Sequence, residues 1–90
     1  MNRVEAIRSA LNNTFEPQQL EIIDDSHKHA GHASAGGAGH FTVRVVSPVF
    51  AGKGLIERHR LVYAALDDLM HSEIHALSIK AETLEETNNQ

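Results

Sequence analysis

Histidine is the residue type in this chain best suited to chemistry. Seven of the 90 residues are His, and three of them lie close together in a stretch rich in Gly, Ala and Ser. Neutral imidazole binds zinc, copper, iron and nickel. The spacing His27-x-His29-x-x-His32 is therefore a candidate ligand cluster. The alternative is an exposed, mobile loop that contains His without binding a metal, and composition alone favours that alternative.

Two further histidines fall on expected regular elements. His75 begins an apolar run, where a strand would hold it at the rim of a sheet with one ring nitrogen turned outward. The alternative is a structural histidine whose hydrogen bonds are satisfied, and spacing alone favours it. His59 falls on the apolar stripe of a helix, and we interpret it as structural, with its ring buried and one nitrogen hydrogen-bonded.

The absence of cysteine limits the chemistry further. The chain has no thiol nucleophile and no disulfide, and it cannot hold an all-cysteine iron–sulfur cluster by itself. Any such cluster would need thiolates from another molecule. No G-x-S-x-G, P-loop, H-E-x-x-H or paired-carboxylate pattern is present, so we expect a protein that is not an enzyme.

A group of basic residues is the other candidate binding feature. Arg44, Lys53, Arg58 and Arg60 are opposed locally only by Glu57, and cations at a turn and helix start can contact phosphates. A solvated charged face is the commoner explanation. The formal net charge of −4 argues against a general nucleic-acid coat or a polybasic membrane binder.

Apolar periodicity predicts the elements that position these residues. Asn2 and Glu5 form a capping-box pattern that starts a helix, which Pro17 ends at the latest. Between the strands, Ser26 to Gly39 is expected to be a mobile loop. The other expected elements are strands over Leu20–Ile23 and Phe41–Val46, a helix over Leu55–Met70, and a strand over Ile74–Ala81 with His75, Leu77, Ile79 and Ala81 on one side.

This order of elements predicts one α+β domain over residues 1–90. The first two strands should be antiparallel, and the strand–helix–strand unit should cross over right-handedly and make the last two parallel. One layer of helices then covers one face of a small three-stranded mixed sheet. We expect residues 82–90 to form a frayed helical turn or a polar tail. No apolar run is long enough to span a membrane and no signal peptide is present, so we expect a cytosolic protein.

Two segments carry a family resemblance. Residues 50–66 contain an F-x-G turn and an R-H-R-x-V-Y helix, and residues 74–77 read I-H-A-L. These patterns resemble the BolA family. With Leu20-Glu21 through His29 and His40-Phe41 added, the resemblance covers nearly the whole chain. The family's αββαβ core, which is similar to a class II KH fold, matches the order of elements expected from periodicity.

The resemblance implies a partner-binding role. BolA-like proteins associate with monothiol glutaredoxins and share a [2Fe–2S] cluster, for which a glutaredoxin Cys and glutathione supply thiolates. The resemblance assigns the histidine of the I-H-A-L strand, His75, as one ligand. The second comes from the loop between the first two strands, where His29 matches best and His27 and His32 are alternates. Mixed Cys and His ligation is known in Rieske centres.

The resemblance also implies an alternative role. Some members of the family are described as DNA-binding transcriptional regulators that affect cell shape and stress responses. Their helix-turn-helix-like region corresponds to Pro48–Leu66, so Lys53, Arg58 and Arg60 would contact DNA. The chain departs from the family in its Gly/Ala-rich loop, which lacks the usual P-A-G stretch, and near Thr87, where many members carry Trp. The sequence leaves open whether the free protein forms a homodimer.

Overall fold

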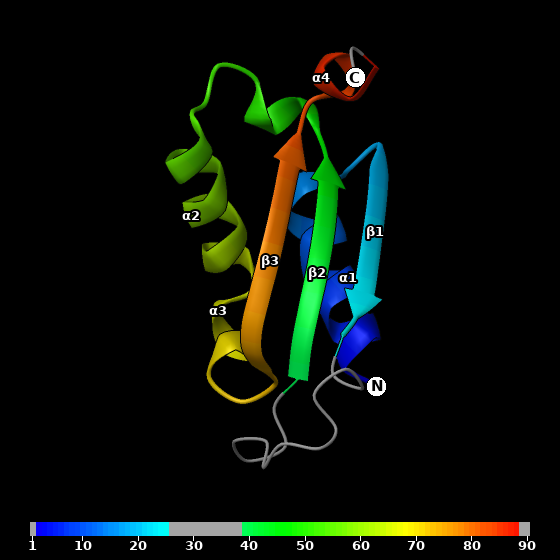
Figure 1. Cartoon of the computed structure of the whole chain (residues 1–90), viewed down its shortest axis with the longest axis vertical. Coiled ribbons are helices and arrows are strands. Elements are labelled where there is room, and N and C mark those ends of the chain that lie inside the picture. Colours follow the sequence, from blue (N-terminus) through cyan, green and yellow to red (C-terminus); the bar gives the residue numbers. More distant parts are fainter. Residues whose placement is uncertain (1, 26–38, 89–90) are drawn as a thin grey trace.

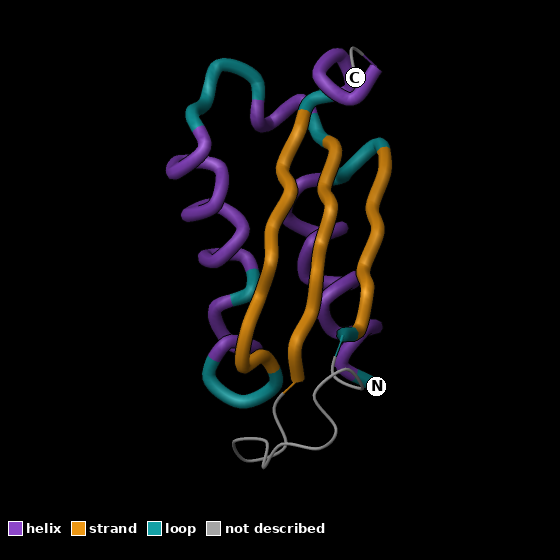
Figure 2. Tube along the Cα trace, viewed as in Figure 1, coloured by secondary structure: helices purple, strands orange, loops and turns teal. Residues whose placement is uncertain are grey.

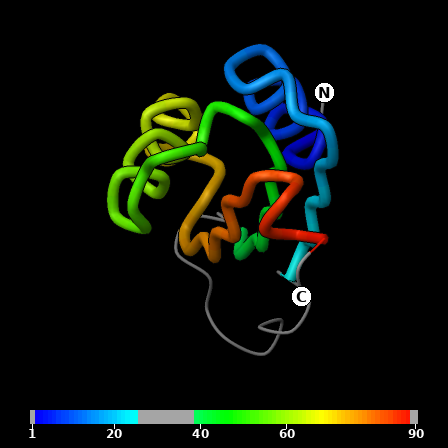
Figure 3. Tube along the Cα trace, turned by 90° about the horizontal axis from the view of Figure 1, so that it is seen from above, coloured from blue at the N-terminus to red at the C-terminus, as the bar shows by residue number. Residues whose placement is uncertain are grey.

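Two helices cover one face of a three-stranded sheet, as Figures 1 and 3 show. The computed structural model describes residues 2–25 and 39–88. The loop histidines His27, His29 and His32 lie outside the described residues. The predicted mobility of that loop concerns the same part of the chain and stays a prediction. The described elements are α1 (Arg3–Phe15), β1 (Gln19–Asp24), β2 (Gly39–Val46), η3 (Pro48–Phe50), α2 (Leu55–Ala65), α3 (Asp67–Met70), β3 (Ile74–Glu82) and α4 (Leu84–Asn88).

The first helix begins and ends where the sequence predicts. Asn2 caps α1, because its side-chain Oδ1 accepts the Glu5 backbone N–H at 2.8 Å. Ile7, Leu11 and Phe15 recur at helical spacing and are buried against the sheet. Glu16 then adopts the left-handed conformation with φ 45° and ends the helix just before Pro17.

The sheet has the order β1-β2-β3, with β1 antiparallel and β3 parallel to β2. The predicted mixed sheet and the αββαβ order are therefore confirmed (Figure 2). In β2, the alternate residues Phe41, Val43 and Val45 are buried in the core beneath the helices. Thr42 and Arg44 lie on the opposite, open face, where Arg44 pairs with Glu21 across the strands.

The predicted helix over Leu55–Met70 is divided in two. Leu66, with φ −103° and ψ 11°, leaves helical geometry, so α2 ends at Ala65 and the short α3 begins at Asp67. Leu66 is 1% exposed and lies in the core, where Val62 of α2 is also buried. Aspartate favours helix starts, which is consistent with a new start at Asp67.

The C-terminal segment is more ordered than the sequence indicated. A frayed helical turn or a polar tail was expected from Glu82, and α4 agrees with the helical turn. Glu82 itself ends β3 with 6% exposure and pairs with Arg44 at 3.3 Å. The short helix α4 follows, and Glu86 in it pairs with Arg58 of α2. Within the described ranges, no helix is both long enough and apolar enough to cross a membrane.

Candidate metal centre

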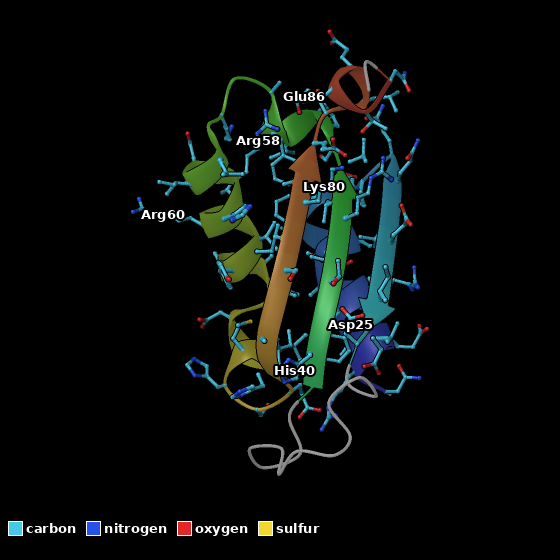
Figure 4. The ribbon with its side chains drawn as sticks, in the orientation of Figure 1. Asp25, His40, Arg58, Arg60, Lys80 and Glu86 are labelled. Atoms are coloured by element: carbon cyan, nitrogen blue, oxygen red, sulfur yellow. The ribbon has the colours of Figure 1, made fainter. Side chains whose placement is uncertain are left out.

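Two histidines meet at one end of the sheet. His40, near the start of β2, and His75, near the start of β3, have ring centroids 5.2 Å apart with the ring planes inclined at 54°. Because parallel strands begin at the same end of a sheet, both residues lie at the end where His40 is labelled in Figure 4. His75 is exposed and His40 is half-buried.

An irregularity in the sheet brings these rings together. Gly39 pairs with Ile74, but His40 pairs with Ala76, so His75 is an extra residue in β3. A β-bulge of this kind redirects a side chain. The expectation that His75 shares a side with Leu77 was wrong, because Leu77 pairs with core residue Phe41. The ring of His75 instead lies against His40, which alternates with Phe41 and belongs to the open face.

Asp25 and Thr42 are hydrogen-bonded next to His40. The Asp25 backbone N–H donates to the His40 carbonyl oxygen at 2.7 Å. The Thr42 hydroxyl donates to Asp25 Oδ2, also at 2.7 Å. The first bond ties the end of β1 to β2 at His40. The second places the Asp25 side chain on the same open face as Thr42.

The geometry of the two imidazoles fits shared ligation of one metal ion. Two imidazoles that ligate one tetrahedral metal through nitrogens at about 2.1 Å have ring centres roughly 5 Å apart. The centroids of His40 and His75 are 5.2 Å apart. Within residues 2–25 and 39–88, no group of three or more His, Cys, Asp or Glu side chains could hold a metal ion. The described pair thus offers two candidate ligands, and a complete metal site would need further ligands from elsewhere.

His59 lies away from this pair, on α2. It is half-buried, and its Nε2 is buried with no hydrogen-bond partner in the described part of the chain. The sequence predicted a buried ring with one nitrogen hydrogen-bonded. The structure instead has the ring half-buried, and its buried Nε2 accepts or donates no hydrogen bond within residues 2–25 and 39–88.

The basic residues do not converge on one surface. Arg58 Nε donates to the Lys53 carbonyl oxygen at 2.8 Å, and Nη1 donates to the Ala81 carbonyl oxygen at 3.0 Å. Its guanidinium also binds both carboxylate oxygens of Glu86, at 2.7 and 2.9 Å. Figure 4 shows Arg60 pointing away from this pair, and Arg60 is exposed.

The Arg58–Glu86 pair changes the proton affinity of both groups. Hydrogen bonds from the Arg58 guanidinium, and next from the Thr83 backbone N–H, lower the pKa of Glu86 to about 2 from its ordinary 4.5. The hydrogen bond to Glu86 is also the main cause that raises the pKa of Arg58. The pair lies at the opposite end of the sheet from His40 (Figure 4), so the two candidate functions use different ends of the molecule.

Sequence reasoning assigned no role to His40 or Asp25. His40 was placed at the exit of the loop, and Asp25 was treated as the end of the first strand. A signal for His40 was present, because two parallel strands that begin near His40 and His75 must place both residues at one end of the sheet. The bulge that turns the rings together had no such signal.

Comparison with known proteins agrees with this architecture. The family model described as BolA-like protein matches residues 11–86. SufE-like protein 1, chloroplastic/mitochondrial, of Arabidopsis thaliana is 49% identical over 83 residues, which cover 86% of this chain and 22% of the relative. Protein BOLA1, chloroplastic, of the same plant is 42% identical over 90 residues, which cover 96% of this chain and 56% of the relative.

A bacterial relative and a solved structure extend the comparison. The DNA-binding transcriptional regulator BolA of Escherichia coli (strain K12) is 35% identical over 82 residues, which cover 91% of this chain and 76% of the relative. The BolA domain of SufE1 from Arabidopsis thaliana is 44% identical in sequence, covers 96% of both chains and superposes with a TM-score of 0.84. The chain thus spans about a fifth of the first plant relative and just over half of the second. Its fold and most of its length place this chain in the BolA-like protein family.

Proposed function

We propose that this chain is a non-enzymatic partner of a monothiol glutaredoxin and shares a [2Fe–2S] cluster with it through histidine ligands, in iron–sulfur or redox regulation. One observation carries the proposal. Two imidazoles, those of His40 and His75, lie 5.2 Å apart at one end of the sheet in a chain that contains no cysteine. Such a pair is half of a ligand set, and it needs a second molecule to complete it.

The chemistry of the donors supports a shared cluster. A glutaredoxin Cys and glutathione would supply thiolates to one iron, and this chain would supply imidazoles to the other. Histidine replaces cysteine on one iron in Rieske centres, where it raises the reduction potential. The imidazole ligands would thus raise the reduction potential of the shared cluster above that of an all-thiolate cluster.

His75 has the properties that a ligand at a protein interface needs. It is exposed, so a second protein can reach it, whereas the preceding Ile74 is buried with 3% exposure. Removal of the His75 side chain should therefore leave the core intact. Imidazole must be deprotonated to bind iron, so assembly of the complex should weaken in acid.

The identity of the second ligand is part of the proposal. We place His40 first, because its ring is the imidazole next to His75 in the described structure. His29, which the family resemblance favours, and its alternates His27 and His32 are the competing candidates from the loop. Single substitutions separate these possibilities, because each removes one imidazole.

The test uses the full chain co-expressed with a monothiol glutaredoxin. His75→Ala should abolish the mixed Cys/His absorption and circular dichroism spectrum, or leave a glutaredoxin-only cluster. His40→Ala should do the same, and His29→Ala should have a smaller effect. His71→Ala is the matched control, because His71 is 76% exposed and belongs to the turn after α3. A His75→Ala complex with an unchanged spectrum would refute the ligand assignment.

A DNA-binding role is the second candidate function, and the name of the Escherichia coli relative favours it. Lys53, Arg58 and Arg60 are the predicted phosphate contacts. Arg58 would first have to exchange Glu86 for a phosphate, which should reduce affinity. If these residues bind phosphates, each neutralisation should lower the salt slope of binding by about one. Absence of binding to duplex DNA at low salt would remove this candidate.

The cytosolic location and a homodimer remain predictions from the sequence. Two plant relatives have names that place them in the chloroplast or in the chloroplast and mitochondrion. Fractionation of cells that produce the tagged full-length protein tests the location. Analytical ultracentrifugation of the purified chain tests whether it forms a homodimer.

A further inference from the structure

The Arg58 guanidinium is held in one orientation by the backbone of two neighbouring segments. Its Nε donates to the Lys53 carbonyl oxygen at 2.8 Å, and its Nη1 donates to the Ala81 carbonyl oxygen at 3.0 Å. The side chain is 12% exposed. A guanidinium carries five N–H donors in a rigid fork, so these two bonds leave the edge formed by Nη1 and Nη2 with donors to spare. That edge is the one that binds a carboxylate or a phosphate through two parallel hydrogen bonds.

A carboxylate of the same chain occupies this edge. Glu86 Oε1 accepts from Arg58 Nη1 at 2.7 Å, and Oε2 accepts from Nη2 at 2.9 Å. A capping box holds the carboxylate there, because the Thr83 backbone N–H donates to Glu86 Oε1 at 2.8 Å and the Glu86 N–H donates to Thr83 Oγ1 at 3.3 Å. Figure 4 shows Arg58 and Glu86 side by side at the end of the sheet where α4 lies.

The helix that supplies this carboxylate is weakly held. The five residues of α4 include none that is buried, and a helix this short is not stable by itself. Besides Glu86, α4 is held by a hydrogen bond at 3.3 Å from Arg44 Nη2 to the Thr87 hydroxyl oxygen. Elements with few buried contacts open at a low cost in free energy. Such an opening would uncover the fork of Arg58 in its fixed orientation, because the Lys53 and Ala81 carbonyl groups lie outside α4.

We infer that the guanidinium of Arg58 is a phosphate-binding site that Glu86 keeps occupied, so that a phosphate binds there only when the α4 carboxylate leaves. Carboxylate and phosphate compete directly, since both present a pair of negatively charged oxygens to the same fork. The inference deepens the DNA-binding candidate function and rests on it for the source of the phosphate, the backbone of duplex DNA. In that role α4 is an autoinhibitory segment that weakens the contact between Arg58 and DNA.

The neighbouring residue Glu85 provides a matched control. It has the same charge, lies one position away on α4 and is exposed. Its side chain lines a surface pocket beside Gln18 and Pro48. Glu85→Gln and Glu86→Gln therefore change the net charge equally, but the second of them removes the carboxylate that occupies the Arg58 fork.

The first test titrates inorganic phosphate into the free full-length chain, labelled with ¹⁵N-arginine, with ionic strength held constant by sodium chloride. The Arg58 Nε–H resonance reports binding, because that group belongs to the same guanidinium. In Glu86→Gln, phosphate should shift this resonance with an affinity at least about fivefold higher than in the wild type or in Glu85→Gln. Urea unfolding checks that each variant stays folded. A resonance that phosphate moves equally in all three proteins, or in none of them, overturns the inference.

The second test measures binding to duplex DNA by fluorescence anisotropy over a range of salt concentrations. Relative to Glu85→Gln, Glu86→Gln should bind at least about fivefold more tightly, and its salt slope should be steeper by about one. Adding Arg58→Lys to Glu86→Gln should cancel most of this gain, because lysine keeps the charge but lacks the fork. Equal DNA affinities of Glu85→Gln and Glu86→Gln would overturn the autoinhibitory role of α4 and leave the DNA-binding candidate in place. If phosphate binds Arg58 in Glu86→Gln but no variant binds duplex DNA, the DNA-binding candidate fails and the occupied phosphate site stands.

Discussion

Replacement of Arg58 by glutamine should raise the pKa of Glu86 from about 2 toward 4.5. The two hydrogen bonds from the guanidinium, at 2.7 and 2.9 Å, are the largest cause of the lowered pKa. Glutamine removes the charge and the bidentate geometry, which make such a pair strong. The Thr83 N–H still donates to Glu86 at 2.8 Å, so the pKa should stop short of the ordinary value.

The assay is an NMR titration of the side-chain carboxyl carbons in ¹³C-glutamate-labelled protein. Arg60→Gln is the control, because it removes one positive charge from the same helix at an exposed position that does not contact Glu86. An unchanged Glu86 titration in Arg58→Gln, or an equal change in Arg60→Gln, would show that the guanidinium of Arg58 does not lower the pKa of Glu86.

The same pair predicts the sign of a pH effect on stability. The pKa of Glu86 is lower in the folded protein than the ordinary 4.5, so folding favours the carboxylate. The stabilisation from the pair is complete above about pH 4.5 and is lost as pH falls toward about 2. Acid titrations of urea stability should therefore show a weaker pH dependence in this range for Arg58→Gln than for the wild type.

Three further substitutions test the fold, each by urea unfolding. Phe50 is fully buried and its ring centroid is 5.1 Å from that of Phe15, so Phe50→Ala should cost about 3–5 kcal/mol of unfolding free energy; a cost below about 1 kcal/mol would contradict the packing. Asn2→Ala removes the cap of α1 and should cost about 0.5–2 kcal/mol, and a neutral result would mean that the cap is not formed. Gly52 has φ 76° with open space where a Cβ would lie, so Gly52→Ala should cost about 1–2 kcal/mol from backbone strain alone; a stabilised variant would refute this conformation.

Local patterns were enough to predict most of the fold. Alternation from Phe41 to Val45 identifies the central strand, because a strand with one buried face must alternate. The capping pattern at Asn2 and the breaker at Pro17 bound the first helix. The handedness of strand–helix–strand units then gives the parallel pairing of β2 and β3.

Features that depend on distant contacts were not predictable in this way. The order of the C-terminal segment comes from pairs such as Arg58–Glu86 and Arg44–Glu82, whose members are 28 and 38 residues apart. The partners of these pairs share no sequence pattern, so the segment was interpreted as a frayed helical turn or a tail. The break at Leu66 could not be predicted either, because the apolar stripe of the helix continues through Leu66 into α3.

The candidate site was predictable in part. The rim position of His75 follows from its place at the start of a strand, and its exposure agrees with that position. Its contact with His40 depends on one extra residue in β3, and hydrophobic periodicity does not report a bulge. The hydrogen bonds that join Asp25 to Thr42 and to His40 form only once the strands are paired, so the sequence could not predict them.

In the proposed function, histidines of this chain ligate a cluster shared with a glutaredoxin. The most direct measurement is pulsed EPR of the reduced complex, with this chain labelled with ¹⁵N-histidine and the glutaredoxin unlabelled. We expect a ¹⁵N hyperfine coupling of the size expected for directly bound imidazole, which His75→Ala weakens or removes and His71→Ala leaves intact. A spectrum with no strongly coupled ¹⁵N from this chain would show that its histidines do not ligate the cluster.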